Sequence, residues 1–295
     1  MADRLKGCGT ALVTPFTRDG AVDEPALRKL VDWQITEGIH FLVPCGSTGE
    51  AATMTPAEHR RVVEITVEQA KGRVPVVAGA GSNDTAKAIA MSKEMRAAGA
   101  THLLHVSPMY NKPPQRGIIA HFERIADATD LPIIVYNVPG RTGSNIEAKT
   151  TLALARLKHI VAVKEASGNL AQITDIIRER PDHFSVLSGD DEITLAVMAA
   201  GGDGVISVIS NATPRAMALL CNMAARNDFD AARTQHLQLL AWMRAAFVES
   251  NPIPVKAAMA LLGKMENHLR LPLVPLADTH TEAIRAALRT AGALR

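Results

Sequence analysis

The chain has 295 residues, of which 47% are hydrophobic, and it carries a formal net charge of +2 at pH 7. This length and composition support a large core of barrel size and exclude a disordered or fibrous chain. The near-balanced charge lacks the broad positive field that nucleic-acid binding needs, so we expect a small-molecule partner and no nucleic acid.

We expect the protein to act in the cytoplasm and away from membranes. The segment 1–6 carries charges where a signal peptide has an apolar run. No apolar stretch approaches the roughly 20 residues of a membrane-spanning helix. The three cysteines, Cys8, Cys45 and Cys221, are widely spaced and lie in apolar or glycine-bearing contexts, which indicates buried structural thiols.

Eight short β-branched or apolar runs alternate with longer segments of helical periodicity. This alternation predicts parallel strands joined by helices, and eight is the strand number of a (β/α)8 TIM barrel. Some runs, such as 132–135 and 160–163, are almost continuously apolar, as expected for strands covered on both faces. The predicted strands are 10–13, 41–44, 74–78, 103–106, 133–137, 160–164, 185–187 and 204–208.

Apolar residues at three- and four-residue spacing predict the helices between these strands. The predicted helices are 23–37, 56–70, 84–98, 115–128, 146–157, 170–178, 190–200 and 214–223. Beyond them helix follows helix without an intervening strand, at 228–248, 254–262 and 281–293. We therefore predict a catalytic (β/α)8 barrel over residues 1–226 and a C-terminal helical domain over 227–295 that packs on it.

A doubly wound open sheet is the competing architecture, and its first sign would be a glycine-rich turn after the first strand. The segment 79–82 lacks the third glycine of that turn, and Gly7-Cys8-Gly9 precedes the predicted first strand. No phosphate-binding Walker loop is present either. The barrel is therefore favoured, and its chemistry is expected on the loops that follow the strands.

Lys164 closes the apolar run 160–163, so its amine is expected to emerge from the barrel wall at the catalytic end. A lysine with an ordinary pKa near 10.4 is neutral in only about one molecule per thousand at neutral pH. Burial lowers this pKa toward the range that suits a nucleophile. The alternative interpretation is a lysine that pairs with Glu165 or merely ends a strand.

Other strand ends carry further candidate residues. Tyr136 ends the fifth predicted strand and can shuttle protons, although a buried tyrosine is also a common packing residue. Arg141 lies in the turn that follows, where a guanidinium can bind a carboxylate with two hydrogen bonds. The glycines of the segment 45–50 allow backbone amides to approach an anion. Tyr110, one of only two tyrosines, lies after the fourth strand.

Together these motifs resemble the dihydrodipicolinate synthase and N-acetylneuraminate lyase superfamily of pyruvate-dependent class I aldolases. The resemblance covers nearly the whole chain and rests on three motifs that occur in the family's order, each where a strand is expected to end. The motifs are Gly46-Ser47-Thr48-Gly49-Glu50, Tyr136-Asn137-Val138-Pro139-Gly140-Arg141-Thr142-Gly143 and Val163-Lys164-Glu165-Ala166-Ser167-Gly168-Asn169. It also includes the segments 9–16, 251–256 and 269–272.

The resemblance implies roles for individual residues. Lys164 forms an imine with pyruvate, and Tyr136 moves protons between the intermediates. Ser47 and Tyr110 complete a proton relay, with Tyr110 reaching into the site of a neighbouring subunit in a homotetramer built from tight dimers. The substrate-binding residues that it implies are Thr48 for the pyruvate carboxylate, Arg141, the backbone near Ile206, and Gly189 beside the second substrate.

The family's branches differ in the aldehyde that they use. An arginine at the position of Arg141 is typical of the synthase branch, which takes L-aspartate 4-semialdehyde and serves lysine and diaminopimelate biosynthesis. Ser47 departs from this branch, because a serine at that position is more typical of the sialic acid lyases. The resemblance therefore favours the synthase branch, with another 2-oxo acid aldolase or dehydratase as the alternative.

Two other classes of function remain as alternatives. A metal-dependent enzyme would use Asp190, Asp191 and Glu192 with a histidine, but the ten histidines show no metal-ligand spacing. A 2-oxo acid sensor without activity would be expected to have lost Lys164 or Tyr136, and both are present. We therefore expect an enzyme that needs neither a metal nor another cofactor.

The resemblance also bears on regulation. Many synthases of the family are inhibited by lysine, which an acidic and an aromatic residue hold between subunits. The corresponding positions here are Lys87 and Met109, with Asn83 and His59 nearby. A cation in place of a carboxylate repels the effector's ammonium group, unless Asp84 supplies the carboxylate. The sequence therefore predicts weak or absent inhibition by lysine.

Overall fold

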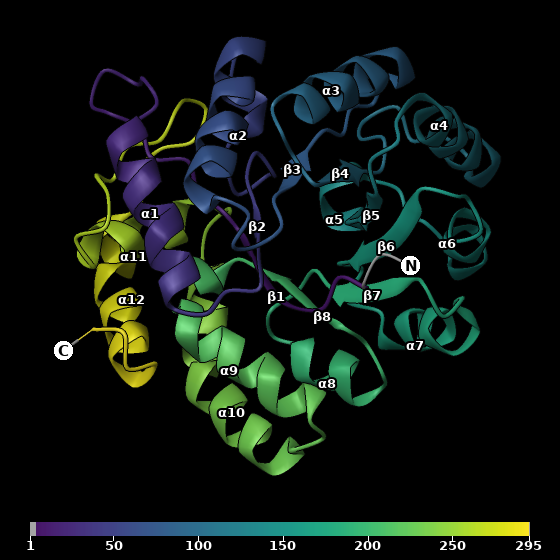
Figure 1. The fold of residues 1–295 in the computed structure, drawn as a ribbon. Helices are drawn as coiled ribbons and strands as arrows, with labels where there is room; N and C mark the ends of the chain where they lie inside the picture. Colours follow the sequence, from purple (N-terminus) through teal and green to yellow (C-terminus); the bar gives the residue numbers. More distant parts are fainter. Residues whose placement is uncertain (1–3, 295) are drawn as a thin grey trace.

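The computed structural model describes residues 4–294 of the chain. Eight parallel strands form one sheet in the order β2-β1-β8-β7-β6-β5-β4-β3. A parallel bridge between Leu42 and Val76 joins the two outer strands of this order, so the sheet curves into a barrel with the helices outside it (Figure 1). The predicted (β/α)8 barrel with C-terminal helices is confirmed.

The strands lie close to their predicted positions. Their bounds are β1 Gly7–Ala11, β2 Phe41–Val43, β3 Val77–Gly79, β4 His102–Val106, β5 Ile133–Asn137, β6 Ile160–Glu165, β7 Ser185–Ser188 and β8 Gly204–Ser207. The first strand begins three residues earlier than predicted. Gly7 pairs with Gly204 in the neighbouring strand, and a side chain on Gly204 would overlap the Gly7 backbone. The segment Gly7-Cys8-Gly9 is therefore part of β1. Gly204 permits the close approach of β8, and Gly9 leaves room for the Phe41 ring of β2.

Helices follow the strands in the expected alternation. Their bounds are α1 Glu24–Thr36, α2 Pro56–Ala70, α3 Thr85–Ala97, α4 Gln115–Ala128, α5 Pro139–Thr142, α6 Ala148–Leu154, α7 Leu170–Glu179, α8 Thr194–Ala199 and α9 Pro214–Ala225, with short 3-10 turns η1 Ala51–Thr53 and η2 Ile209–Asn211. Helix α8 begins four residues later than predicted. Asp190 and Asp191 stay in the preceding loop, where the Asp191 carboxylate accepts hydrogen bonds from two backbone amides directly after β8.

Three helices follow the barrel: α10 Phe229–Ala245, α11 Ile253–Leu261 and α12 Asp278–Thr290. Helix α10 packs against α9 and α12, and α11 packs against α12 and η2. These helices cover one side of the barrel (Figure 1). The division of the chain into domains at residues 226 and 227 stays a prediction. Among the described residues no helix has the length and apolarity needed to cross a membrane.

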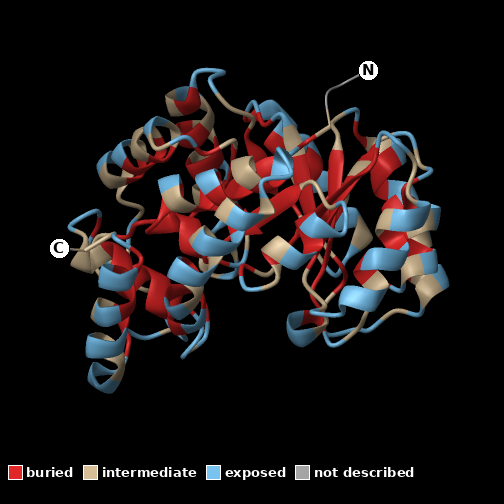
Figure 2. Ribbon diagram, turned by 90° about the horizontal axis from the view of Figure 1, so that it is seen from below, coloured by how far each residue is buried: buried red, intermediate tan, exposed pale blue. Residues whose placement is uncertain are grey.

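The core has two layers, because successive side chains of a strand point to opposite faces. One layer fills the barrel and includes Phe41, Ile134 and Leu187. The other lies between the strands and the surrounding helices and includes Val135 and Val163. Figure 2 shows buried residues along the strands and on the inner sides of the helices. This alternation decides which side chains of β5 and β6 can reach the barrel interior.

Candidate active site

A cavity of 410 Å³ lies at the carboxyl ends of the strands, where barrel enzymes place their chemistry. Residues in or directly after seven of the strands line it: Ala11, Val43, Leu104, Tyr136, Lys164, Gly189 and Val208. Residues of α10 and the segment after it, Met243, Arg244, Phe247 and Asn251, line it too. The C-terminal part of the chain therefore contributes directly to this cavity.

Lys164 is the central cationic group of the cavity. Its side chain is only 5% exposed, and its Nζ lies 4.1 Å from the centroid of the Tyr136 ring. No hydrogen bond or ion pair joins this amine to another residue in the described part of the chain. Burial lowers the pKa of Lys164 to about 7; the charge of Asp191 opposes this shift and that of Arg141 adds to it. A substantial fraction of the amine is therefore neutral, and nucleophilic, near pH 7.

The strand register brings Tyr136 and Lys164 together. The two residues are direct partners across the β5–β6 pair, and both point into the barrel. Their neighbours Asn137 and Glu165 are also partners, but on the opposite face. There the buried Glu165 carboxylate accepts hydrogen bonds from Asn137 Nδ2 at 3.1 Å and the Ser167 amide at 2.8 Å. The alternative in which Lys164 pairs with Glu165 is therefore wrong.

Gly189 provides the space that the lysine occupies. A methyl group at this position would lie 3.1 Å from both Cγ and Cε of Lys164 and 2.6 Å from the side chain of Ala166. Such contacts would force the lysine stem to move, so a larger residue here would displace the amine. Gly189 thus shapes the cavity beside the amine, and its place near the second substrate stays a prediction.

Tyr136 is buried and lines the same cavity. Burial raises the pKa of Tyr136 to about 12, against the opposing effect of the Arg141 charge. The phenol therefore stays protonated at neutral pH. It can donate a proton to an oxygen that develops negative charge beside Lys164, and recover it in a later step.

Two groups suited to carboxylates lie on the rim of the cavity. Thr48 is buried and its Oγ1 accepts a hydrogen bond from Asn251 Nδ2 at 2.8 Å, while Ser47 beside it is exposed. Arg141 is exposed on α5 and donates from Nη2 to the backbone carbonyl of Asn251 at 3.0 Å. Its remaining N–H groups have no acceptor among the described residues, so the guanidinium can still bind an anion.

Two predicted site residues do not line the cavity. Tyr110 is 90% exposed, with a left-handed backbone at φ 71°, and its amide donates to the Thr142 carbonyl at 3.3 Å. Ile206 lies inside the barrel and is fully buried, while Val208 two residues later lines the cavity instead. The roles assigned to both residues stay predictions.

Several residues of the cavity were not predicted from the sequence. Arg244 of α10 forms an ion pair with Glu192 at 2.7 Å, and both residues line the cavity. Asn251 contacts both Thr48 and Arg141. The only local signal for Asn251 was its place in the segment 251–256 of the family resemblance, which says nothing about what the side chain touches.

The acidic loop shows no metal-site arrangement. Asp191 Oδ2 accepts hydrogen bonds from the amides of Val208 at 2.9 Å and Ile209 at 3.1 Å, and Glu192 is paired with Arg244. Within residues 4–294, no group of three or more histidine, cysteine, aspartate or glutamate side chains could hold a metal ion. These contacts give the carboxylates structural partners.

The fold and this cavity define a class of protein, the (β/α)8 barrels with a buried lysine amine at the carboxyl ends of their strands. A model of the dihydrodipicolinate synthetase family matches residues 4–291. The chain therefore belongs to the dihydrodipicolinate synthetase family.

Individual relatives agree with this assignment. A 4-hydroxy-tetrahydrodipicolinate synthase from Koribacter versatilis is 50% identical over 293 residues, which cover 99% of this chain and 98% of the relative. The crystal structure of dihydrodipicolinate synthase from Thermotoga maritima has a TM-score of 0.97 at 42% identity and covers 99% of this chain and 100% of its own.

A chloride-inhibited dihydrodipicolinate synthase from Acinetobacter baumannii, complexed with pyruvate, has a TM-score of 0.96 at 41% identity, with 98% of this chain and 99% of that chain covered. The predicted family, the predicted synthase branch and the predicted enzyme class, a lyase, are confirmed by these relatives. The assignment of individual residues to steps of the reaction is a separate question.

Proposed function

We propose that the chain condenses pyruvate with L-aspartate 4-semialdehyde, and that Lys164 forms the imine with pyruvate on which the reaction depends. The observation that carries this proposal is the buried, unpaired Lys164 amine, whose pKa is lowered to about 7 and which faces Tyr136 in the cavity. The names of the relatives, 4-hydroxy-tetrahydrodipicolinate synthase, support the choice of reaction.

The steps follow from the chemistry of a primary amine. Neutral Lys164 Nζ attacks the carbonyl carbon of pyruvate and forms a carbinolamine, which loses water to give the imine. The protonated imine draws electrons from the methyl group, so a methyl proton is lost and an enamine forms. The enamine carbon then forms a bond to the aldehyde carbon of the second substrate. The aldehyde oxygen takes up a proton and the imine forms again. Attack on the imine carbon by the amino group of the second substrate closes a ring, breaks the bond to Lys164 Nζ and releases the free amine.

The residues around Lys164 supply protons and hold the substrates. Tyr136, protonated at neutral pH, gives a proton to the carbinolamine oxygen as water leaves. Ser47 relays protons beside it, and Thr48 holds the pyruvate carboxylate through its hydroxyl and amide. Arg141 binds the carboxylate of the aldehyde. Gly189 and the backbone near Ile206 complete the walls of this site.

A homotetramer built from tight dimers is part of the proposal. Tyr110 is exposed on a loop with a left-handed backbone, which is an unusual place for an aromatic side chain. A neighbouring subunit that received this side chain would bury it and complete the proton relay with Ser47. We also expect a cytoplasmic location, and activity without a metal or another cofactor.

Ser47 favours one second candidate. Because serine at this position is more typical of the lyase branch, the chain could act on another aldehyde, derived from a sugar, through the same imine. The two candidates share the lysine chemistry and differ only in the second substrate. Turnover of pyruvate with a panel of aldehydes therefore separates them, since only the first candidate gives a rate with L-aspartate 4-semialdehyde.

Reductive trapping tests the proposal itself. Pyruvate with sodium borohydride should reduce the imine to a stable adduct on Lys164, which peptide mass spectrometry would locate. The matched control is Lys256, a second buried lysine that should stay unmodified because Glu50 pairs with it. An adduct on another lysine, or none, would overturn the assignment. A chelator should leave the rate unchanged, and a chelator-sensitive rate would favour the metal-dependent alternative.

A further inference from the structure

Asn251 lies between the two groups proposed to bind the substrate carboxylates. Its side-chain Nδ2 donates to Thr48 Oγ1 at 2.8 Å, and its backbone carbonyl accepts from Arg141 Nη2 at 3.0 Å. The residue is 6% exposed and lines the cavity. One residue of the C-terminal segment thus contacts Thr48 through its side chain and Arg141 through its backbone.

The direction of the first hydrogen bond determines what the Thr48 hydroxyl can do. A hydroxyl has one hydrogen to donate and two lone pairs that accept. Because Asn251 Nδ2 occupies a lone pair of Thr48 Oγ1, the hydroxyl hydrogen remains for another acceptor. No acceptor for it is present among residues 4–294. A carboxylate in the cavity would be the strongest acceptor available to it.

The other end of the Asn251 amide is left without a partner. Its Oδ1 is buried and has no hydrogen-bond partner among the described residues. An unpartnered buried carbonyl is costly, so the fold keeps this side chain for a reason other than its own hydrogen bonding. A role at the cavity accounts for the cost, because the amide group must stand beside Thr48 to donate to it.

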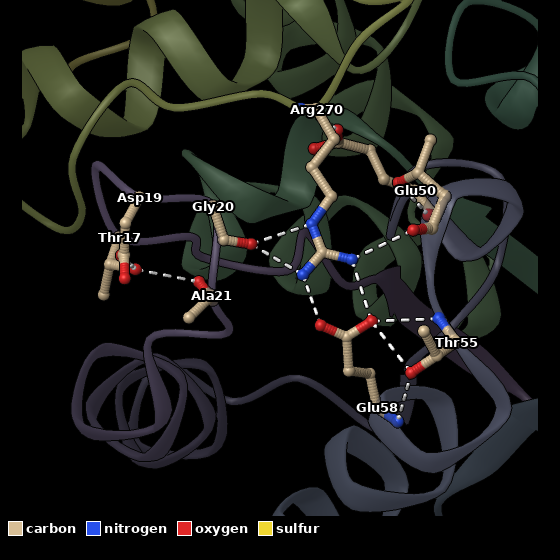
Figure 3. Close-up of polar contacts among 9 residues, drawn as sticks. Thr17, Asp19, Gly20, Ala21, Glu50, Thr55, Glu58 and Arg270 are labelled. Carbon is tan, nitrogen blue, oxygen red and sulfur yellow. Dashed lines mark hydrogen bonds and ion pairs between the residues drawn. The ribbon is translucent and has the colours of Figure 1, made fainter.

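The C-terminal segment is fixed firmly enough to hold Asn251 in place. The Lys256 amine, five residues later, lies 2.6 Å from Glu50 Oε1, and both side chains are fully buried. The Arg270 amide donates to Glu50 Oε2 at 3.1 Å, and its guanidinium reaches between Gly20 and Glu58 (Figure 3). Glu50 ends the loop that carries Thr48, so these contacts tie the C-terminal segment to that loop.

We infer that Asn251 is a positioning residue, which turns the Thr48 hydroxyl toward the carboxylate of the 2-oxo acid. The inference rests on the proposed function. The inference predicts different effects on the binding of the two substrates, because the side chain of Asn251 acts through Thr48 whereas only its backbone contacts Arg141. Substitution of the side chain should therefore weaken pyruvate binding and leave the aldehyde site as it is.

Steady-state kinetics of two variants test this inference. Asn251→Ala should raise KM for pyruvate by about three- to tenfold, the usual weight of one neutral hydrogen bond, with KM for L-aspartate 4-semialdehyde within about twofold of wild type. Asn251→Asp should raise KM for pyruvate further, because a carboxylate accepts the Thr48 proton and repels the substrate. A wild-type KM for pyruvate in the Asp variant would show that Thr48 donates to residue 251 instead.

A double-mutant comparison separates positioning from a structural role. In a Thr48→Val background, Asn251→Ala should change KM for pyruvate by less than about twofold, because the group through which it acts is gone. Equal effects in both backgrounds, or a rise in KM for the aldehyde alone, would overturn the inference. Borohydride trapping of pyruvate by wild type is the control: its absence would mean that the proposed function itself had failed.

Discussion

Two lysines of this protein are buried in different surroundings. Lys164 lies in the cavity at the carboxyl ends of the strands, and no described residue accepts a hydrogen bond from its amine. Lys256 lies where the C-terminal helices meet the loop after β2, and its amine contacts Glu50 Oε1 at 2.6 Å and the Thr14 carbonyl at 2.9 Å. Burial lowers the pKa of both lysines, but only at Lys256 does an ion pair oppose the shift.

The difference shows that burial alone does not make a lysine reactive. A buried ammonium group with a carboxylate partner is held in its charged form and contributes to structure. A buried amine without such a partner is partly neutral at pH 7 and free to react. A buried lysine is therefore structural at one place in this molecule and reactive at another, and the groups around its amine determine which role it has.

Replacement of Lys164 should have the largest effect. Lys164→Met should lower kcat by a factor on the order of 10⁴ or more, as expected when a covalent nucleophile is removed. The fold should be retained, and the free energy of unfolding should not decrease, because an unpaired buried amine costs desolvation energy. Initial rates measure the loss of kcat, and thermal melting measures the stability of the fold. Residual activity near the wild-type level would show that Lys164 is not the reactive lysine.

Replacement of Lys256 should affect stability first. Lys256→Met leaves the Glu50 carboxylate buried without its cation, which should cost about 3 to 5 kcal/mol of unfolding free energy. Denaturant unfolding would measure the loss. The double variant Lys256→Met with Glu50→Gln should recover much of it, since no charge is then left unpaired. Lys264→Met, at an exposed lysine over the Trp33 ring, is the matched control and should cost far less.

Arg141 is the cation beside Lys164, as Glu50 is the anion beside Lys256. Arg141→Ala should raise KM for L-aspartate 4-semialdehyde about ten- to a hundredfold, the effect of losing a charge-assisted pair, and KM for pyruvate much less. Arg244→Ala is the control, because Arg244 lines the same cavity but is already paired with Glu192. Equal changes in both KM values would show that Arg141 does not select the aldehyde.

The pH dependence of imine formation reports the state of Lys164 directly. Only the neutral amine attacks, so with a pKa of about 7 the rate of borohydride-trapped adduct formation should fall about tenfold from pH 8 to pH 6 and level off above pH 8. In Arg141→Ala the midpoint should move to higher pH, because the positive charge of Arg141 lowers the pKa of Lys164. A rate that still rises at pH 10 would indicate an ordinary lysine.

The sequence was sufficient to predict the barrel and the pair at the centre of the cavity. Apolar runs and the residues at their ends are local signals, and consecutive strands of a barrel are neighbours, so they locate Tyr136 and Lys164 on neighbouring strands without a structure. The beginning of β1 was misplaced because its glycines are explained only by contacts elsewhere in the fold: a side chain on Gly9 would overlap the Phe41 ring of β2, and Gly7 pairs with Gly204 of β8. A contact of this kind leaves no periodic pattern.

The same limit applies to the C-terminal contribution to the site. Asn251 and Thr48 are 203 residues apart, and Lys256 and Glu50 are 206 apart. Residues 253–259 of α11 are all buried, and Lys256 is the one charged residue among them. The apolar run around Lys256 indicates burial, but the sequence alone does not identify Glu50 as its partner.

A third lysine, Lys87, lies at the surface, and the change in enzyme rate expected there is the smallest of those predicted. Lys87 is exposed in the first turn of α3, near the place where regulated members of the family offer lysine a carboxylate. Asp84, the other possible source of that carboxylate, accepts the Lys87 amide at 2.8 Å as the cap of this helix. We therefore expect millimolar lysine to leave initial rates essentially unchanged, since like charges meet at this site.

A charge reversal at Lys87 tests whether repulsion is what prevents inhibition by lysine. Lys87→Glu replaces the repelling cation by an attracting carboxylate, while Met109 and Asn83, whose Nδ2 donates to the Met109 carbonyl at 3.2 Å, stay as they are. This variant should gain measurable inhibition by lysine if charge is the deciding factor, and Lys87→Ala should gain less. Saturable inhibition of the wild-type enzyme in the millimolar range would mean that the effector meets a carboxylate after all, and Asp84→Asn should then abolish it.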